Sequence, residues 1–177
     1  MTFISDSLNR IKPSATMVIT AKATQLKREG KKVIGLSSGE PDFDTPQHVK
    51  QAAIDAINSG YTKYTNIEGI PELRQSIVEK FKKDNDLNYD VSNVIVGTGG
   101  KQILFNALMS SLNKDDEVII PAPYWVSYPD MTLLAGGKPI FVDCSSETNF
   151  KLTGEALEKV ITKNSKWLIL NLSLIHI

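Results

Sequence analysis

A β-branched run, a glycine-rich turn and a helical pattern follow one another and constrain the fold of this chain more than any other stretch. Residues 94–96 (Val-Ile-Val) predict a buried strand. Apolar residues then recur over residues 103–112 with the spacing of an amphipathic helix. The turn between them, residues 97–101 (Gly-Thr-Gly-Gly-Lys), has three glycines that allow a tight bend and a close approach to a ligand. The stretch therefore predicts a strand–turn–helix unit.

The same turn carries the chemistry that a phosphate needs. A helix start leaves backbone N–H groups unpaired, and these donors, the helix dipole and the ammonium of Lys101 can together bind an anion. The Gly-Lys-Ser/Thr order of a Walker loop and the G-x-G-x-x-G pattern are both missing, which argues against a nucleotide. The residues alone leave two alternatives open: a phosphate site at Gly99, Gly100 and Lys101, or a plain turn with a solvated lysine.

Strand and helix patterns alternate along the chain. Helical patterns separate short apolar runs, which predict strands at residues 33–36, 94–96, 117–120, 138–142 and 167–170. Alternation at this length implies parallel pairing with right-handed crossovers, so the predicted fold class is α/β. Ligands of such sheets bind at the carboxyl ends of the strands, where residues 97–101 and the Pro-Ala-Pro-Tyr-Trp loop at residues 121–125 are both expected.

Charge and composition exclude several function classes. The 20 basic and 20 acidic residues cancel, which argues against a nucleic-acid binder or a protein held on an anionic membrane. The single cysteine, Cys144, has no partner for an intrachain disulfide and fits a reducing compartment. The N-terminal residues contain no long apolar run, so we expect a cytoplasmic protein. His48 and His176 are interpreted as neither metal ligands nor bases, and no metal site is predicted.

Four motifs, taken together in their order and spacing, resemble the class I aminotransferases. They are Ser38-Gly39-Glu40-Pro41-Asp42-Phe43, Tyr61-Thr62-Lys63-Tyr64, Gly99-Gly100-Lys101-Gln102 and Pro123-Tyr124-Trp125-Val126-Ser127-Tyr128-Pro129. Residues 12–16, Lys-Pro-Ser-Ala-Thr, are similar to the N-terminal arm of the bacterial aspartate aminotransferases in this family, some of which also accept prephenate. The resemblance extends from about residue 8 to residue 171.

The resemblance implies a cofactor and several residue roles. The family uses pyridoxal 5′-phosphate in a fold type I homodimer, with a three-layer αβα large domain. Gly99 and Gly100, with Lys101, would hold the cofactor phosphate through backbone N–H groups and the ammonium. Trp125 would lie against the pyridine ring and help to enclose the substrate; the alternative is a tryptophan of the core or of its rim.

Three further residues gain roles from the resemblance. Gly39 would present its backbone to the α-carboxylate of the substrate. Tyr64 would cross the dimer interface to the cofactor phosphate of the other subunit, or else be an ordinary surface aromatic. Lys12 would bind the second carboxylate of prephenate, or else remain a solvated arm residue.

The resemblance also predicts the domain plan and its limits. Residues 1–45 would form the arm and part of the small domain, residues 46–171 the first half of the large domain, and residues 172–177 a non-native tail. The lysine that binds the cofactor covalently lies beyond this segment in the family, so no catalytic residue is expected here and the 177 residues alone should be inactive.

The expected parent activity is amino transfer between aspartate or glutamate and a 2-oxo acid, with prephenate as a further acceptor. Two alternatives stay open. The first is another fold type I enzyme, such as an aromatic or alanine aminotransferase or a C–S lyase. The second is a non-catalytic phosphate-binding module.

Overall fold

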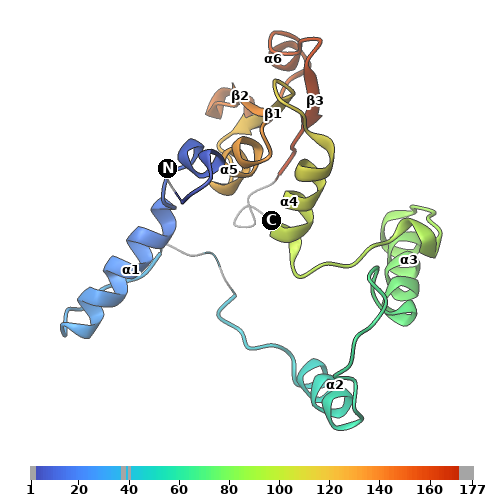
Figure 1. Cartoon of the computed structure of the whole chain (residues 1–177). Helices are drawn as coiled ribbons and strands as arrows, with labels where there is room; N and C mark the ends of the chain where they lie inside the picture. The colour runs from blue at the N-terminus through green and yellow to red at the C-terminus, as the bar shows by residue number, and fades with distance from the viewer. Residues whose placement is uncertain (1–2, 37–38, 40, 172–177) are drawn as a thin grey trace. The chain divides into compact units, whose positions relative to one another are not determined.

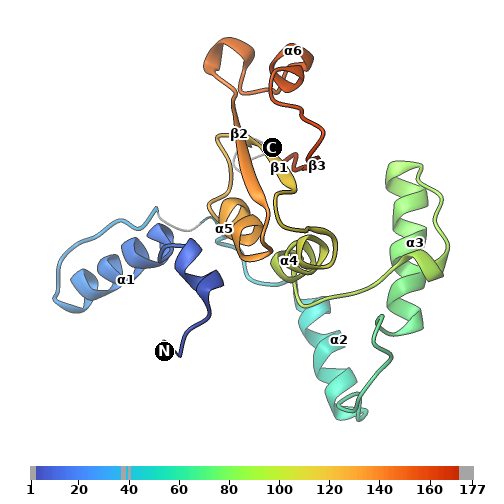
Figure 2. The same ribbon diagram turned by 45° about the horizontal axis from the view of Figure 1, so that its top comes forward.

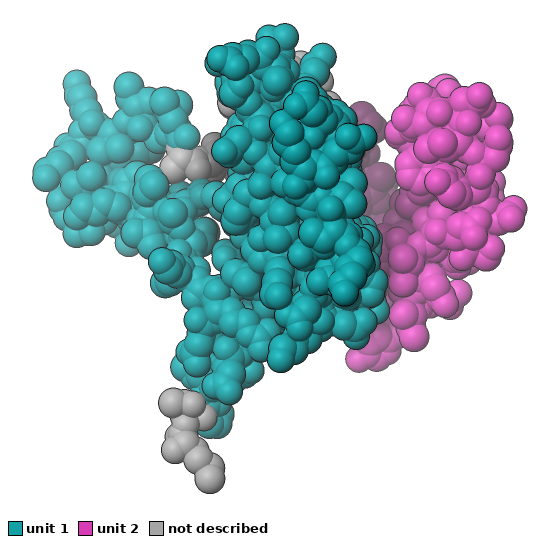
Figure 3. Space-filling model, turned by 90° about the horizontal axis from the view of Figure 1, so that it is seen from above, with its two compact units in different colours: residues 1–40, 104–177 teal, residues 41–103 magenta. Residues whose placement is uncertain are grey.

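The computed structural model describes residues 3–36, 39 and 41–171. The chain divides into two compact units, residues 1–40 with 104–177 and residues 41–103, which Figure 3 colours separately. Each unit is described by itself below. The expected domain boundary at residue 45 stays a prediction, and the expected tail at residues 172–177 lies outside the described residues.

A three-stranded parallel sheet forms the centre of the first unit (Figures 1 and 2). Its strands are β1 (Glu117–Ala122), β2 (Lys138–Asp143) and β3 (Ser165–Leu168), in the order β2-β1-β3. Strand β1 pairs in parallel with both neighbours. All three overlap predicted strands, although β3 begins and ends two residues before the predicted 167–170, and their parallel pairing confirms the α/β fold class.

The hydrophobic core lies against one face of β1. Val118 and Ile120 are 0 % exposed, and alternation along the strand places them on the same face. Helices α4 (Gly100–Ser111) and α5 (Ser127–Leu134) cover that face. The buried residues of this cluster are Leu108, Leu112, Val118, Ile120, Tyr128 and Met131.

A polar contact joins the last strand to the first of these helices. The indole Nε1 of Trp167 in β3 donates to Ser111 Oγ in α4 at 2.9 Å. Trp167 pairs with Val118 in the sheet register, so its ring also packs against the core cluster. One side chain thus adds apolar contact and satisfies its own N–H group.

Charged side chains gather at the amino ends of the strands. Asp115 pairs with Lys138 at 2.8 Å, and Asp116 pairs with Lys166 at 2.9 Å. The hydrogen bond and charge of Lys138 lower the pKa of Asp115, and the same contact raises the pKa of Lys138. The Glu117 carboxylate accepts hydrogen bonds from the hydroxyls that precede and begin β3, Thr162 at 2.6 Å and Ser165 at 3.1 Å.

Shorter elements complete the first unit. The N-terminal arm forms η1 (Asp6–Arg10) and α1 (Ala15–Arg28), and Ser14 is the N-cap of α1 because its side chain accepts from Met17 N. Arg10 Nη1 donates to Leu133 O at 3.3 Å, near the carboxyl end of α5, where a cation is favourable. Two short helices, η3 (Ser146–Thr148) and α6 (Gly154–Glu158), connect β2 to β3.

The second unit is helical. It contains α2 (Gln47–Asn58), α3 (Pro71–Asn85) and η2 (Val91–Asn93). Pro71 is at the first position of α3, as its fixed φ and missing N–H favour. The guanidinium of Arg74 in α3 donates to Val91 O at 2.5 Å, which holds the segment after α3 against that helix.

Two of the predicted strands are wrong. Residues 33–36 and 94–96 belong to no strand in the described part of the chain. Val94 has the extended conformation of a strand, with φ −112° and ψ 127°, but no ladder forms beside it. Val96 N instead donates to Glu68 O at 2.9 Å. β-Branched residues favour an extended backbone, but a strand also needs a neighbouring strand in register.

Shortening a buried side chain of the central strand β1 should destabilise the protein. We expect Ile120→Ala to lower the free energy of unfolding by about 2–5 kcal/mol, because it leaves a cavity beneath two helices. Ile161→Ala is the matched control, since this isoleucine is 53 % exposed, and its effect should be under about 1 kcal/mol. Chemical denaturation measures both, and equal losses would contradict a core centred on β1.

The Asp115–Lys138 pair should contribute stability only where both groups are charged. The pKa of Asp115 is lowered on folding, so its contribution exists above the ordinary pKa of 3.8 and is lost as the pH falls through the folded value. The pKa of Lys138 is raised, so its contribution exists below 10.5 and is lost as the pH rises through the folded value. Melting curves of wild type and Lys138→Met should therefore differ modestly between these limits and converge outside them.

Lys151→Met is the control for this comparison, because no ion pair to Lys151 is found among the described residues. A difference between wild type and Lys138→Met that persisted unchanged at pH 3 would show that the charge pair is not its source.

Candidate functional site

The glycine-rich turn leads into helix α4 and leaves a donor at its start. Gly99 has φ +84°, a left-handed conformation that glycine adopts readily. Its carbonyl accepts from Gln102 N at 3.2 Å and Ile103 N at 3.4 Å, which closes the first turn of the helix. Gly99 N itself donates to Gly97 O at 3.0 Å. Among the described residues none accepts from Gly100 N, so this N–H group matches the unpaired donor expected at a helix start.

The space around the turn is open on one side and full on the other. A Cβ atom built on Gly99 or on Gly100 would meet no atom within 4 Å. A Cβ atom on Gly97 would lie 2.5 Å from Ile103 Cδ1 and 2.9 Å from Gln102 Oε1. Side chains at positions 99 and 100 would thus fill the free space beside the helix start, where a bound anion would lie. The lack of a Cβ there, the unpaired N–H of Gly100 and the positive end of α4 fit a phosphate group.

A second glycine supports this turn from the preceding loop. Gly69 has φ +107°, and a Cβ atom there would lie 2.8 Å from Val96 Cγ2. The carbonyl beside it, Glu68 O, accepts from Val96 N. The loop before α3 therefore packs closely on the residue that precedes the glycine turn, and only glycine fits at that point. This requirement for glycine at position 69 was not predicted from the sequence.

Two more predicted residues belong to the same unit. The side chain of Lys101 lies on the exposed first turn of α4. Tyr64 is fully exposed, in the loop between α2 and α3. An exposed phenol agrees with both interpretations made from the sequence, a residue that reaches another subunit and a surface aromatic. Its role stays a prediction.

An aromatic cluster follows β1 in the other unit. The ring of Tyr124 stacks on Phe141 of β2, with centroids 5.0 Å apart and planes 16° apart. Trp125 meets Tyr128 of α5 edge to face, at 5.4 Å and 80°. Tyr128 is buried, and this burial raises the pKa of its phenol. Trp125 O accepts from Tyr128 N at 3.1 Å, so both the ring and the backbone of the tryptophan are anchored on α5.

The anchored tryptophan keeps surface for a ligand. Trp125 remains 37 % exposed, whereas Tyr128 beneath it is 6 % exposed. A large flat ring that is held by its neighbours and partly open is suited to pack against a planar ligand. This exposure also fits the alternative interpretation of a tryptophan at the rim of the core, so the contact of Trp125 with a cofactor ring stays a prediction.

The remaining predicted residues lie on the N-terminal segment. Lys12 is exposed between η1 and α1. Gly39 is exposed too, and a Cβ atom there would meet nothing within 4 Å. The contact of Arg10 with α5 holds the arm two residues before Lys12. The roles of Lys12 and Gly39 stay predictions.

The predicted residues thus fall into two groups. Gly99, Gly100, Lys101 and Tyr64 belong to residues 41–103, whereas Trp125, Lys12 and Gly39 belong to the other unit. Each group has a defined local arrangement within its own unit. That both groups act on one ligand stays a prediction.

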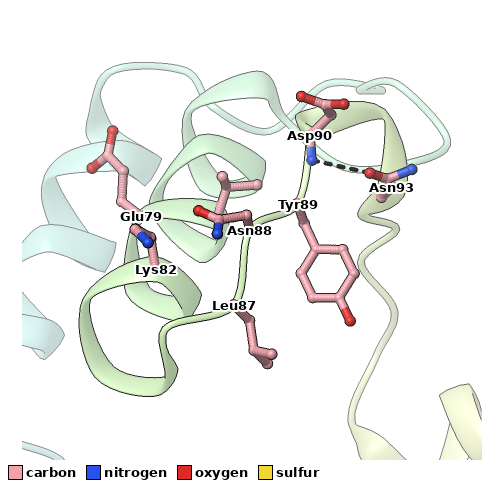
Figure 4. Close-up of a pocket in the computed structure, with 8 residues that line it drawn as sticks. Glu79, Lys82, Leu87, Asn88, Tyr89, Asp90 and Asn93 are labelled. Atoms are coloured by element: carbon pink, nitrogen blue, oxygen red, sulfur yellow. Dashed lines mark hydrogen bonds between the residues drawn. The ribbon is translucent and has the colours of Figure 1, made fainter.

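A hollow of about 540 Å³ lies elsewhere, between α3 and the segment that follows it (Figure 4). Its wall includes Glu79 and Lys82 of α3, Tyr89 and Asp90 of the following loop, and Asn93 of η2. Asp90 N donates to Asn93 Oδ1 at 3.0 Å, the dashed line in Figure 4, and the Tyr89 ring packs on Phe81. These contacts hold the loop against the helix, and none of the predicted site residues lines this hollow.

Metal clusters and membrane-spanning helices are both absent from the described part of the chain. No group of three or more histidine, cysteine, aspartate or glutamate side chains there is placed to hold a metal ion. No helix within residues 3–36 or 41–171 is long and apolar enough to cross a membrane.

Comparison with known proteins identifies the family. Residues 31–172 match the model of a family described as aminotransferase class I and II. The chain belongs to this family. The four motifs that resembled the class I aminotransferases therefore reflect membership, and the expected likeness is confirmed.

Curated aminotransferases are similar along almost the whole chain. The "Probable aspartate/prephenate aminotransferase" of Rickettsia bellii is 60 % identical over 171 residues, which are 97 % of this chain and 43 % of that protein. The "Aspartate/prephenate aminotransferase" of Cereibacter sphaeroides has the same identity and coverage. The chain therefore spans less than half the length of these relatives.

Solved aminotransferase structures have the same fold. The aspartate aminotransferase of Rhizobium meliloti matches with a TM-score of 0.90 and 50 % identity, over 95 % of this chain and 42 % of that one. The Thermus thermophilus enzyme with maleate matches with a TM-score of 0.93 and 45 % identity, over 96 % and 44 %. The fold of the segment is thus the fold of the corresponding part of an aspartate aminotransferase.

Two residues of the glycine turn make contacts that the sequence did not predict. Gln102 stood in a quoted motif without a role, yet its Oε1 accepts from Thr98 N at 2.5 Å. Gly97 was interpreted only as one of three glycines that allow a tight bend, whereas a Cβ atom there would displace the ends of the Gln102 and Ile103 side chains. A glutamine at the third position of a helix, a place where its side chain can reach back to the N-cap, was the available signal.

Proposed function

We propose that the full-length protein, meaning a chain of the relatives' length that contains this segment, is a pyridoxal 5′-phosphate-dependent aminotransferase. It transfers an amino group between aspartate or glutamate and a 2-oxo acid, with prephenate as a further acceptor. The observation that carries the proposal is the 60 % identity over 171 residues to proteins named aspartate/prephenate aminotransferases.

The glycine turn supports the cofactor part of this proposal. The open space at Gly99 and Gly100 and the unpaired N–H of Gly100 suit the dianionic phosphate of the cofactor. Lys101 adds positive charge on the first turn of α4. When bound, the cofactor supplies an electron sink that stabilises negative charge on the α-carbon of the substrate.

The other predicted residues would bind and orient. Trp125, anchored on Tyr128, would pack against the pyridine ring and limit water near the substrate. Gly39 would offer its backbone to the substrate α-carboxylate, because no side chain occupies the space around it. Tyr64 would act across a homodimer, with its exposed hydroxyl donating to the phosphate of the second subunit.

The proposal also separates this segment from the complete enzyme. The segment positions the cofactor phosphate and ring, and we expect the group that binds the cofactor covalently to lie in the remainder of the full-length protein. The alternatives of a C–S lyase or a non-catalytic phosphate-binding module have no support in the names of the similar proteins.

The segment and the full-length protein should differ in activity. With pyridoxal 5′-phosphate, aspartate and 2-oxoglutarate, the full-length protein should form oxaloacetate, whereas the 177-residue chain should show no turnover. A coupled malate dehydrogenase assay measures oxaloacetate, and the long-wavelength absorbance of the bound cofactor is the second readout. A full-length protein without turnover or cofactor absorbance would overturn the proposed function.

Lys12 in the N-terminal arm should affect turnover of prephenate much more than turnover of aspartate. Lys12→Ala in the full-length protein should lower kcat/KM for prephenate by about 10- to 100-fold, the loss expected when a charge-assisted hydrogen bond to a carboxylate is removed. The value for aspartate with 2-oxoglutarate should change less than about threefold. Lys22→Ala, in the exposed part of α1, is the control and should affect neither substrate. Equal losses for both substrates would contradict the role of Lys12 in selecting prephenate.

A further inference from the structure

The side chain of Gln102 folds back over the glycine turn. Its Oε1 accepts from Thr98 N, four residues earlier in the chain. In the usual capping box the third helical residue reaches the N-cap N–H, but here that group, Gly99 N, already donates to Gly97 O. Gln102 Oε1 therefore accepts from the preceding N–H group, Thr98 N. As a result, the N–H groups of Thr98 and Gly99 both donate to atoms of the turn and its helix start.

The carboxamide of Gln102 contacts the turn on one side, although the residue as a whole is exposed. A Cβ atom built on Gly97 would lie only 2.9 Å from Gln102 Oε1. The carboxamide therefore packs directly against the backbone of the turn. Ile103 Cδ1 occupies the other part of that space, 2.5 Å from the same position. A residue larger than glycine at position 97 would push both side chains away. The absence of a side chain at Gly97 and the carboxamide of Gln102 therefore form one packed unit.

This unit determines which donor faces the open side of the turn. Thr98 N and Gly99 N are occupied internally, while no described residue accepts from Gly100 N. The open space also lies at Gly99 and Gly100, where a Cβ atom would meet nothing. The hydrogen bond from Thr98 N to Gln102 thus stabilises a turn conformation in which Gly100 N lies beside the open space.

We propose that Gln102 is a positioning residue for the phosphate site: by accepting from Thr98 N it holds the 97–99 turn ready for the phosphate of pyridoxal 5′-phosphate. The inference rests on the proposed function, because it presupposes that a phosphate binds at this turn. A preorganised turn loses less conformational entropy on binding than a flexible one. The hydrogen bond between Gln102 and Thr98 should therefore increase the affinity of the site for a phosphate.

Two other roles make different predictions. If the carboxamide merely occupies Thr98 N in place of a phosphate oxygen, its removal should strengthen phosphate binding. If it serves only as a helix cap, its removal should destabilise the protein and weaken every ligand of the site equally.

The experiment measures two ligands with the full-length apoprotein. The first is 4′-deoxypyridoxine 5′-phosphate, which carries the phosphate but no aldehyde. The second is 4′-deoxypyridoxine, the same compound without the phosphate. Gln102→Ala should weaken the first ligand about 3- to 10-fold, the worth of one hydrogen bond, and leave the second unchanged. Calorimetry or quenching of tryptophan fluorescence gives both dissociation constants.

Asn106→Ala is the matched control. This residue is exposed one turn further along α4, so its truncation changes the same helix without touching the turn. We expect the affinities for both ligands to stay at the wild-type values.

Gly97→Ala tests the same contact from the other side. The new methyl group displaces the Gln102 carboxamide, so this variant should also weaken the phosphate-bearing ligand selectively. In the double variant Gly97→Ala/Gln102→Ala no carboxamide remains to displace, and the combined loss should be smaller than the product of the two single losses. Gly97→Ala also serves as the test if Gln102→Ala does not fold.

The outcomes separate this inference from the proposed function. Unchanged or tighter phosphate binding in Gln102→Ala, or an equal loss for both ligands, would overturn the role of Gln102 while leaving the cofactor site intact. If the wild-type protein bound the two ligands equally, there would be no phosphate site, and both proposals would fail.

Discussion

Burial of the central strand β1 is the interaction on which the first unit depends. Val118 and Ile120 are fully buried under α4 and α5, and both neighbouring strands pair with β1 in parallel. The loop that follows β1 carries Trp125, and this residue is anchored on α5, which packs on the same strand. The predicted cofactor-stacking ring therefore takes its position from the core.

The two ends of this sheet have different chemistry. The amino ends carry carboxylate–lysine pairs and the hydroxyl contacts of Glu117, all of which are satisfied within the unit. The carboxyl ends carry the stacked rings of Tyr124 and Phe141 and the partly exposed Trp125. Parallel strands bring their carboxyl ends to one edge, so residues that can bind a ligand gather there, while residues that only stabilise the fold occupy the other edge.

The sequence predicted much of this arrangement, and its errors have physical causes. The helices around Pro71 and Ser14 follow local signals, a proline at the first position and a serine N-cap, which act within one turn. Val94 has the predicted extended backbone, but its membership of a sheet depends on a partner far away in the chain. Gln102 was missed because its role depends on the fold of the turn that it contacts.

By itself the sequence determined the α/β class, the helix starts at Ser14 and Pro71, three of its five predicted strands and the aminotransferase family, because periodicity, capping residues and motif spacing are local or ordered along the chain. Only the tertiary structure decided that Trp125 meets Tyr128 edge to face, that the Gln102 and Ile103 side chains pack on Gly97, and that no described residue accepts from Gly100 N. These features depend on which atoms lie within a few ångströms in space, and residue order does not specify such distances before the chain has folded.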